Sequence, residues 1–313
     1  MANLAEIWSR AAAELLPPRD ETLSEWIERT IQLPQGLSAD PGPVTLWPPQ
    51  REIADSIGDP DVERVSWLKS VRSGYTFLLT AAIARDVLDA PQPIITLLPT
   101  LSDARDYIVS DLEPLFAASP SLRGLLSEPE KHEDRSTLLH RLFPGGSLKV
   151  IAAKAPRNLR RHTARAVFAD EIDAMDSVEG NILKLAERRT LTFARRKLVC
   201  GSSPKVEDTS LIAALYASSD QRVYEIECPA CGDHFELLWR HIEWKPGEPE
   251  SAHAVCPECG GVIEEADKPR ALERGRWRAT APTVKGHHGY KLNALVSLLP
   301  NCALMPAARY GLN

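Results

Sequence analysis

The sequence lacks any uninterrupted apolar run of roughly 18 residues, so we expect no helix that spans a membrane. Met1 to Glu6 contain neither a basic segment nor an apolar core, so we also expect no signal peptide. We therefore expect a cytoplasmic protein. The apolar content of 43% and charged content of 26% are typical of a soluble globular chain, and 313 residues suffice for one α/β domain with an appendage or for two domains.

Acidic residues are missing from three parts of a chain whose formal net charge is −6. None occurs after Glu273, and two shorter segments contain only basic charges. These segments hold Lys154, Arg157, Arg160, Arg161 and Arg165, and then Arg188, Arg189, Arg195, Arg196 and Lys197. Basic patches on an acidic protein suit a phosphate ligand or a nucleic-acid track, although solvated helix faces are an equally simple interpretation.

A regular Walker A motif is also missing, but residues 65–76 have the layout of a phosphate-binding loop. A β-prone run ends near Leu68, a polar loop follows, and an Ala-rich helix is predicted over 75–90. Strand, loop and helix N-terminus together offer backbone N–H groups to a phosphate. Lys69 and Arg72 add positive charge, and the Thr76 hydroxyl suits Mg²⁺, but Tyr75 stands where the motif needs its Lys. By itself the stretch is equally an ordinary βα turn.

Two further predicted strands carry polar residues at their carboxyl ends. The strand over 166–169 is followed by Asp170 and Glu171, and the strand over 197–200 leads to Ser202 and Ser203. Ligands of open parallel sheets collect at this edge. An Asp beside a phosphate loop can hold Mg²⁺ through water, and an adjacent Glu can orient and deprotonate the attacking water. A strand running into an acidic loop is the alternative.

The continuous apolar run over 93–98 predicts a buried parallel strand, residues 148–152 predict another strand, and residues 62–68 form the strand of the first βα unit. The predicted fold class is α/β, a P-loop NTPase (ASCE/RecA-like) with a mostly parallel sheet flanked by helices. We predict a helical entry segment over 1–60, with helices near Ala5–Leu16 and Leu23–Ile31, and the ATPase core over 61–223. In the Pro-rich turn before the core, Trp47 and Gln50 could hold an adenine by stacking and a bidentate amide contact, or simply pack and cap a helix.

Four of the six cysteines form two Cys-x-x-Cys pairs, Cys228 with Cys231 and Cys256 with Cys259. In a cytosolic protein such pairs indicate metal ligands before disulfides. Four thiolates leave no open position, so we predict a structural Zn²⁺ in a zinc-ribbon-like module over 224–265, with a hairpin within Phe235–Trp244.

Taken together, the motifs resemble one family, the large terminase subunit of tailed phages in its GpA-type branch, whose members are DNA-packaging ATPases. The matching stretches are Trp47-Pro48-Pro49-Gln50, Leu68-Lys69-Ser70-Val71-Arg72-Ser73-Gly74-Tyr75-Thr76, Phe168 to Asp173, Gly201-Ser202-Ser203-Pro204, the Cys pairs and Gly289 to Leu295. The family's own phosphate loop is irregular, with a Lys at its start and Gly-Tyr-Ser/Thr at its end. The irregularity that weakens a Walker A assignment therefore strengthens this resemblance.

The resemblance implies a role for each of these residues. Residues 69–76 (Lys69, Ser70, Val71, Arg72, Ser73, Gly74, Tyr75 and Thr76) would bind ATP, with Lys69 and Arg72 on the β- and γ-phosphates. Thr76 and Asp170 would hold Mg²⁺, and Glu171 would be the catalytic carboxylate. Ser202 and Ser203 would couple the phosphate state to DNA movement, and Trp47 and Gln50 would lie near the base. Arg160 or Arg161 would stabilise developing charge, and the choice between them stays open.

The implied function is ATP hydrolysis that translocates double-stranded DNA into a procapsid. The implied partners are DNA, the small terminase subunit and the portal, with a possible homo-oligomeric ring. The resemblance fades after Leu295 and no carboxylate cluster follows Glu273, so we expect no working nuclease domain in the segment 266–313. One alternative is an inactive, truncated prophage remnant that binds DNA or partners through a zinc ribbon; another is a helicase-like ATPase unconnected with packaging.

Overall fold

The computed structural model describes residues 20–35, 41–70, 72–128, 137–177, 180–204, 209–298 and 304. The helix expected near Ala5–Leu16, the loop residue Val71 and most of the tail after Leu298 lie outside these ranges. Within them, no helix is long and apolar enough to cross a membrane.

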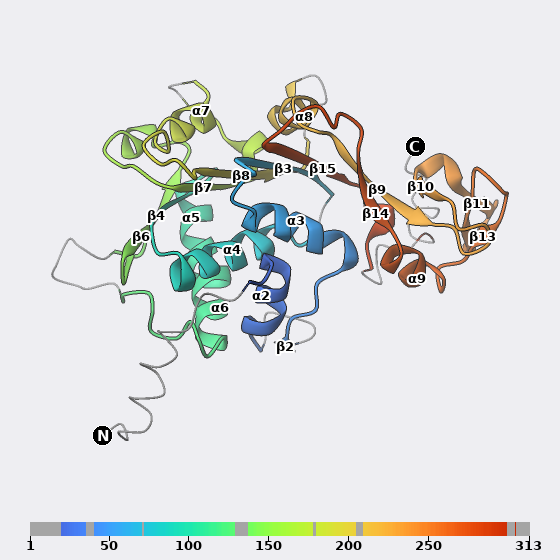
Figure 1. Cartoon of the computed structure of the whole chain (residues 1–313), viewed down its shortest axis with the longest axis horizontal. Helices are drawn as coiled ribbons and strands as arrows, with labels where there is room; N and C mark the ends of the chain where they lie inside the picture. Colours follow the sequence, from blue (N-terminus) through green and yellow to red (C-terminus); the bar gives the residue numbers. More distant parts are fainter. Residues whose placement is uncertain are drawn as a thin grey trace.

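A mostly parallel sheet forms the centre of the molecule (Figure 1). Nine strands of this 10-stranded sheet follow the order β10-β9-β15-β3-β8-β7-β4-β6-β5. The tenth, β14, lies off this path and also pairs with β9. The parallel strands are β9 (Arg222–Glu227), β15 (His287–Leu292), β3 (Arg64–Lys69), β8 (Lys197–Ser202), β7 (Ala166–Asp170), β4 (Pro93–Leu98) and β6 (Gly146–Ala152). The edges are antiparallel: β5 (His140–Phe143) on β6, and β10 (His234–Glu236) and β14 (Arg276–Ala279) on β9. The predicted mostly parallel α/β sheet is confirmed.

Helices cover both faces of the sheet, and the alternation of buried side chains along the strands explains why. On β7, Ala166 and Phe168 belong to one apolar core, whereas Val167 and Ala169 belong to the other. Because successive side chains of a strand point to opposite faces, a continuous apolar run fits a strand covered on both sides.

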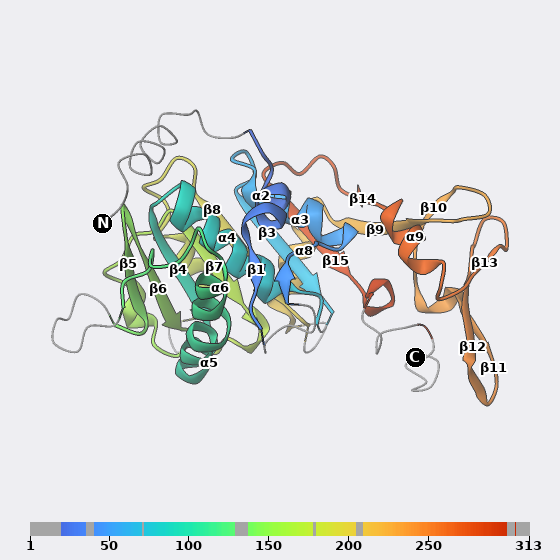
Figure 2. The same cartoon turned by 90° about the horizontal axis from the view of Figure 1, so that it is seen from below.

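Figures 1 and 2 show the larger helical layer on one face and a thinner layer on the other. The larger layer contains α2 (Leu23–Thr30), α3 (Pro48–Gly58), α4 (Tyr75–Asp89), α5 (Leu101–Tyr107), the π-helix η1 (Ile108–Leu112) and α6 (Glu113–Ala118). The thinner layer contains α7 (Ile182–Glu187), α8 (Leu211–Ala217) and the short 3₁₀ segments η2 (Pro156–Leu159) and η3 (Ile172–Ala174). A small ribbon, β1 (Gln32–Leu33) with β2 (Gly42–Pro43), lies outside both.

The cysteine-bearing part extends from the β9 end of the sheet. It has its own three-stranded antiparallel sheet of β11 (Ile242–Lys245), β12 (Glu248–Val255) and β13 (Val262–Ile263), next to η5 (Trp239–His241) and α9 (Lys268–Glu273). The hairpin expected within Phe235–Trp244 is wrong in position. The tight turn lies at Gly247, between β11 and β12, because His234 to Glu236 instead extend the main sheet beside β9.

The last described strand, β15, lies in the middle of the main sheet between β9 and β3. It comes from the segment that the sequence placed after the cysteine pairs, and the 3₁₀ segment η6 (Ala294–Val296) follows it. Its Leu292 carbonyl accepts a hydrogen bond from Ser70 N at 3.1 Å, so this strand supports the start of the phosphate-loop candidate.

Candidate functional site

Three neighbouring strands end in the polar residues that the sequence singled out. Lys69 is the last residue of β3, Asp170 of β7 and Ser202 of β8, and β8 lies between the other two. The carboxyl ends of parallel strands share one edge, which is why residues 69, 170 and 202 meet there.

Lys69 forms the centre of a buried ion cluster. Its Nζ lies 2.8 Å from Asp170 Oδ1 and 2.9 Å from Glu171 Oε1, and only 9% of its side chain is exposed. The other Asp170 oxygen, Oδ2, accepts a hydrogen bond of 2.5 Å from Thr76 Oγ1. A lysine at the end of β3 therefore reaches both carboxylates that follow β7.

Glu171 has an unusual backbone conformation that aims its side chain at this cluster. Its φ is +54°, in the left-handed region that residues other than glycine rarely adopt. One carboxylate oxygen contacts Lys69, and the other accepts a hydrogen bond of 3.3 Å from Ser202 Oγ. About 46% of the Glu171 side chain stays exposed, so this carboxylate faces solvent while Asp170 is buried.

The loop before α4 combines the same conformation with a tight contact to α3. Arg72 (φ +59°) and Gly74 (φ +88°) are both left-handed, and alternating conformations of this kind turn backbone N–H groups toward an anion. A Cβ at Gly74 would lie 2.4 Å from Gln50 Nε2, so glycine is needed for space as well as for backbone geometry. Gln50 Nε2 donates to the Ser73 carbonyl at 2.9 Å and thereby fixes the loop to α3.

The same hydrogen bonds show what Gln50 does in this structure. Its Oε1 accepts from Trp47 N at 2.9 Å, so the amide caps α3 with one end and holds the loop with the other. The capping alternative is therefore what the structure contains. Each end of the amide therefore already has one protein partner, and base binding by Trp47 and Gln50 stays a prediction.

Tyr75, which replaces the usual motif lysine, points into the protein core. It is 2% exposed, and its hydroxyl donates to the Ala169 carbonyl at 2.7 Å. Its ring lies so close to β8 that a Cβ at Gly201 would come within 2.6 Å of it. Lys69 Nζ lies 4.8 Å from the ring centroid, a cation–π distance. Burial raises the pKa of the phenol far above its usual value, so the hydroxyl stays protonated.

A cavity of about 310 Å³ opens directly above the ion cluster. It is lined by Lys69, Ser70, Arg72, Ser73, Gly74, Tyr75, Thr76, Phe77, Glu171 and Ser203. All the described residues predicted to bind phosphate therefore lie around one space. Arg72 is exposed at its rim, where its side chain can reach an anion inside.

The four cysteines of the two pairs also converge, as predicted. Their sulfur atoms all lie within 4.8 Å of one another, with Cys228 3.8 Å from Cys259 and Cys231 3.9 Å from Cys256. Ligands at about 2.3 Å from a tetrahedral ion stand roughly 3.8 Å apart, so these thiolates fit such an ion. The arrangement of these four sulfur atoms supports a metal-binding cluster.

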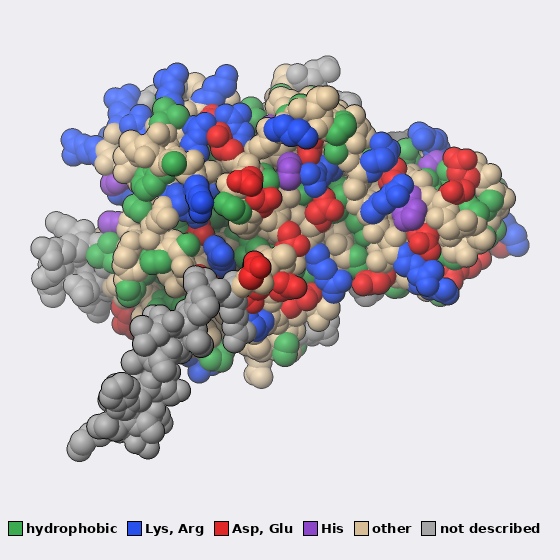
Figure 3. Space-filling view, in the orientation of Figure 1, with side chains coloured by type: hydrophobic (Ala, Val, Ile, Leu, Met, Phe, Trp, Pro, Cys, Tyr) green, Lys and Arg blue, Asp and Glu red, His purple; other side chains and the backbone are tan. Residues whose placement is uncertain are grey.

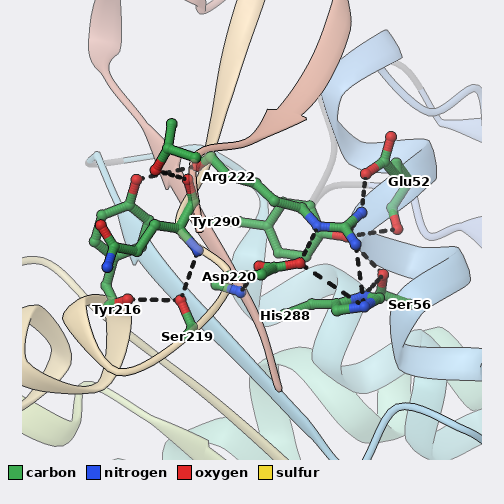
Figure 4. Close-up of polar contacts among 11 residues, drawn as sticks. Glu52, Ser56, Tyr216, Ser219, Asp220, Arg222, His288 and Tyr290 are labelled. Atoms are coloured by element: carbon green, nitrogen blue, oxygen red, sulfur yellow. Dashed lines mark hydrogen bonds and ion pairs between the residues drawn. The ribbon is translucent and has the colours of Figure 1, made fainter. Parts of the chain in front are cut away.

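A second ion cluster, centred on Arg222, is a feature that sequence reasoning missed (Figure 4). Arg222 Nε lies 2.7 Å from Asp220 Oδ2, Nη1 pairs with Glu52 and Nη2 lies 3.0 Å from His288 Nε2. Its partners come from α3, from the segment just before β9 and from β15, and only the Gly289–Leu295 motif in the family resemblance indicated this region. Trp277 Nε1 adds a bond of 2.9 Å to the Pro49 carbonyl of α3.

The fold and this edge of the sheet define an α/β protein with a large, mostly parallel sheet and a phosphate-sized cavity at the carboxyl ends of its strands. Residues 38–277 match the family described as phage terminase large subunit gpA, ATPase domain. The chain belongs to this family, and the predicted resemblance to the ATPase domain of terminase large subunits is confirmed.

Two curated relatives are terminase large subunits. The sequence is 26% identical over 264 residues to that of Escherichia phage lambda, covering 81% of this chain and 41% of the relative. It is 27% identical over 288 residues to that of Enterobacteria phage P21, covering 88% and 44%. The chain thus spans less than half the length of these relatives. The crystal structure of the bacteriophage HK97 large terminase shares the fold, with a TM-score of 0.51 at 14% identity over 63% of this chain and 40% of the other.

Proposed function

We propose that this chain hydrolyses ATP in the cavity above Lys69, and that hydrolysis drives translocation of double-stranded DNA into a procapsid. The observation that carries the proposal is the position of Lys69 Nζ between the Asp170 and Glu171 carboxylates on the floor of that cavity. Family membership supports the ATPase activity, and the roles below are argued from the chemistry of the residues.

Phosphate binding falls to the loop and to the two cations beside it. The left-handed residues Arg72 and Gly74 shape a backbone that can donate N–H groups to phosphate oxygens. Lys69 supplies a point charge at the floor and Arg72 a planar fork at the rim. When a phosphate enters, Lys69 exchanges part of its contact with Glu171 for a contact with the ligand, which frees that carboxylate.

Thr76 and Asp170 would hold Mg²⁺, because their hydroxyl and carboxylate oxygens are adjacent and hard oxygen ligands are what this ion binds. When bound, the ion neutralises charge on the β- and γ-phosphates. Glu171, freed from Lys69 and half exposed to the cavity, accepts a proton from the attacking water. Ser202 donates to Glu171, so the end of β8 senses whether this carboxylate is engaged.

The further partners follow from the same proposal. The small terminase subunit, the portal and a homo-oligomeric ring would assemble around the ATPase core. Zn²⁺ held by Cys228, Cys231, Cys256 and Cys259 would stabilise the part that extends from β9, because four thiolates leave no position for a substrate.

The test of the ATPase is phosphate release by the purified chain with and without Mg²⁺, duplex DNA and procapsids. We expect Mg²⁺-dependent release that Glu171→Gln lowers by at least ~100-fold. Lys285→Gln, at an exposed lysine remote from the cavity, is the matched control and keeps the activity. Equal rates for the unmodified chain and Glu171→Gln under every condition would mean that the chain does not hydrolyse ATP at this site.

The zinc assignment has its own test. Metal analysis of protein purified without chelator should give about one Zn²⁺ per chain, and stripping it with a chelator should lower the melting temperature. A content far below one ion, with no effect of chelator, contradicts the assignment whatever the ATPase assay shows.

A further inference from the structure

Two basic segments that lie far apart in the sequence come together on the thinner helical layer. Arg189 Nη1, just after α7, donates to the Arg160 carbonyl after η2 at 3.2 Å, and Ala164 N donates to the Arg189 carbonyl at 3.1 Å. These bonds place the basic residues of both segments on one surface. We define the basic face as Arg157, Arg160, Arg161, Lys184, Arg188 and Arg189.

Four of the six cations on the basic face have no ionic partner in the part of the chain that the structure describes. Among the described residues, Arg157, Arg161, Lys184 and Arg188 are exposed and have no acidic group within ion-pair distance. Two of the neighbouring acids are engaged elsewhere. Glu187 pairs with Arg64, and Asp173 accepts from Ser210 Oγ and from Ile212 N. Figure 3 shows Lys and Arg side chains gathered over the α7 end of the molecule.

The basic charge continues from this face toward the edge of the sheet. Lys149 Nζ of β6 lies 2.5 Å from Nε2 of His162, which follows Arg161 directly. Burial lowers the pKa of His162, and the nearby charge of Lys149 lowers it further. A cation that depresses the pKa of its neighbour marks a place with surplus positive charge, which a bound anion relieves.

We propose that the basic face binds the phosphate backbone of duplex DNA. The inference rests on the proposed function, whose substrate it locates on the molecule. The formal net charge of −6 has the same sign as DNA, so binding needs a region where cations are concentrated. Spaced cations on exposed side chains suit a regular polyanion and carry no sequence preference.

The basic face is also linked to the ATPase site by one strand. The segment after η2 leads into β7, which ends in Asp170, and α7 is the first α-helix after that strand. The basic segment therefore joins β7 at its start, and the Lys69 cluster lies at the end of the same strand, which gives a force on the DNA backbone a direct path to the ATPase site.

The experiment is fluorescence anisotropy with a labelled duplex of about 30 base pairs, measured between about 50 and 200 mM salt. The test variant is Arg157→Glu/Lys184→Glu/Arg188→Glu. The matched control, Arg105→Glu/Arg270→Glu/Lys285→Glu, makes the same change of charge at exposed residues elsewhere. We expect the test variant to bind DNA at least ~10-fold more weakly, and its negative slope of log K against log salt to become shallower by about 3. The affinity of the control should stay within about twofold of that of the unmodified chain.

Three outcomes overturn the proposal: no DNA binding by the unmodified chain at about 50 mM salt, equal losses in both triple variants, or displacement of DNA by poly-glutamate as effective as by unlabelled duplex. If the triple variant does not fold, Arg157→Gln, Lys184→Gln and Arg188→Gln are measured singly, each with an expected slope change of about 1. ATP turnover without DNA separates this proposal from the proposed function. If the chain bound DNA through the basic face but had no ATPase activity, only the proposed function would be contradicted.

Discussion

Two buried ion clusters in this chain use similar groups in different ways. Lys69 meets Asp170 and Glu171 on the floor of a cavity, and one of these carboxylates stays half exposed. Arg222 meets Asp220, Glu52, His288 and Tyr290 between α3, β9 and β15, and each of its three guanidinium nitrogens has a partner. The first cluster lies on a cavity floor and can exchange a partner for a ligand. We call the second the closed cluster because its guanidinium has no unpaired nitrogen, although the Glu52 side chain is 40% exposed.

The choice of cation matches this difference. A lysine ammonium is a compact charge on a flexible stem and can move between acceptors, whereas an arginine fork fixes the direction of several acceptors at once. The two clusters are joined by α3, since Gln50 at its start holds the Ser73 carbonyl and Ser56 near its end contacts His288 and Tyr290. The comparison teaches that burial and charge alone do not identify a catalytic site; access to a cavity does.

Removal of Lys69 is the strongest way to test the open cluster. We expect Lys69→Ala to reduce ATP turnover by at least ~1,000-fold, because the phosphate loses its charged partner at the floor of the cavity. The measurement is steady-state phosphate release at saturating ATP and Mg²⁺. Lys69→Ala also leaves the buried Asp170 carboxylate without its ionic partner, which should lower the free energy of unfolding by about 3 kcal/mol, so turnover is compared at a temperature where both proteins are folded.

The control for this prediction is Arg222→Lys in the closed cluster, which keeps a positive charge outside the cavity. It should leave turnover within about threefold at a temperature where the protein is folded. Equal activity losses in Lys69→Ala and Arg222→Lys would remove the distinction between the clusters.

Most of the open cluster could be predicted from the sequence, whereas only the segment around Tyr290 in the closed one was indicated, by the Gly289–Leu295 motif. Lys69, Asp170 and Ser202 each end an apolar run, and parallel strands bring such ends together whatever the details of packing. Arg222 meets Glu52, 170 positions earlier, and His288, 66 positions later. No local pattern encodes such a meeting, because it depends on β15 entering the sheet between β9 and β3. The predicted position of the hairpin in the cysteine-bearing part is wrong for a similar reason, because β10 pairs with β9 of the main sheet.

The closed cluster should respond in stability. Arg222→Met leaves the Asp220 carboxylate buried without its ionic partner, and such losses cost about 3 kcal/mol in the free energy of unfolding. Urea denaturation followed by circular dichroism measures it. Arg274→Met removes a more exposed pair with Glu227 and serves as the control, with an expected loss below about 1 kcal/mol. A loss of that small size for Arg222→Met would show that the closed cluster does not hold these elements together.

Acidification probes the histidines beside the closed cluster. Burial, aided by the charge of Arg64, lowers the pKa of His287 to about 4, while in the unfolded chain it titrates near its ordinary value. Between about pH 6.5 and pH 4 the unfolded chain therefore binds a proton that the folded chain does not. The contribution of His287 to the free energy of unfolding should be fully present above this window. It should decrease by up to about 3 kcal/mol as the pH falls through the window. His287→Gln, which can keep a bond to Ser66 Oγ, should flatten the fall; parallel curves for both proteins would contradict this account.

The smallest effect is expected at Tyr75, although it occupies the usual position of the catalytic lysine. Tyr75→Phe removes only the bond to the Ala169 carbonyl, at a cost of about 1 kcal/mol in the free energy of unfolding, and should leave ATP turnover within about twofold. The sharper variant is Tyr75→Lys in the Lys69→Ala background. Although its ring lines the cavity beside Lys69, the side chain at position 75 packs against Gly201 and ends at the Ala169 carbonyl, so this lysine should not restore phosphate release. Recovery of activity would show that a lysine at position 75 can replace Lys69. The position of Lys69 at the end of β3 would then not be required for ATP turnover.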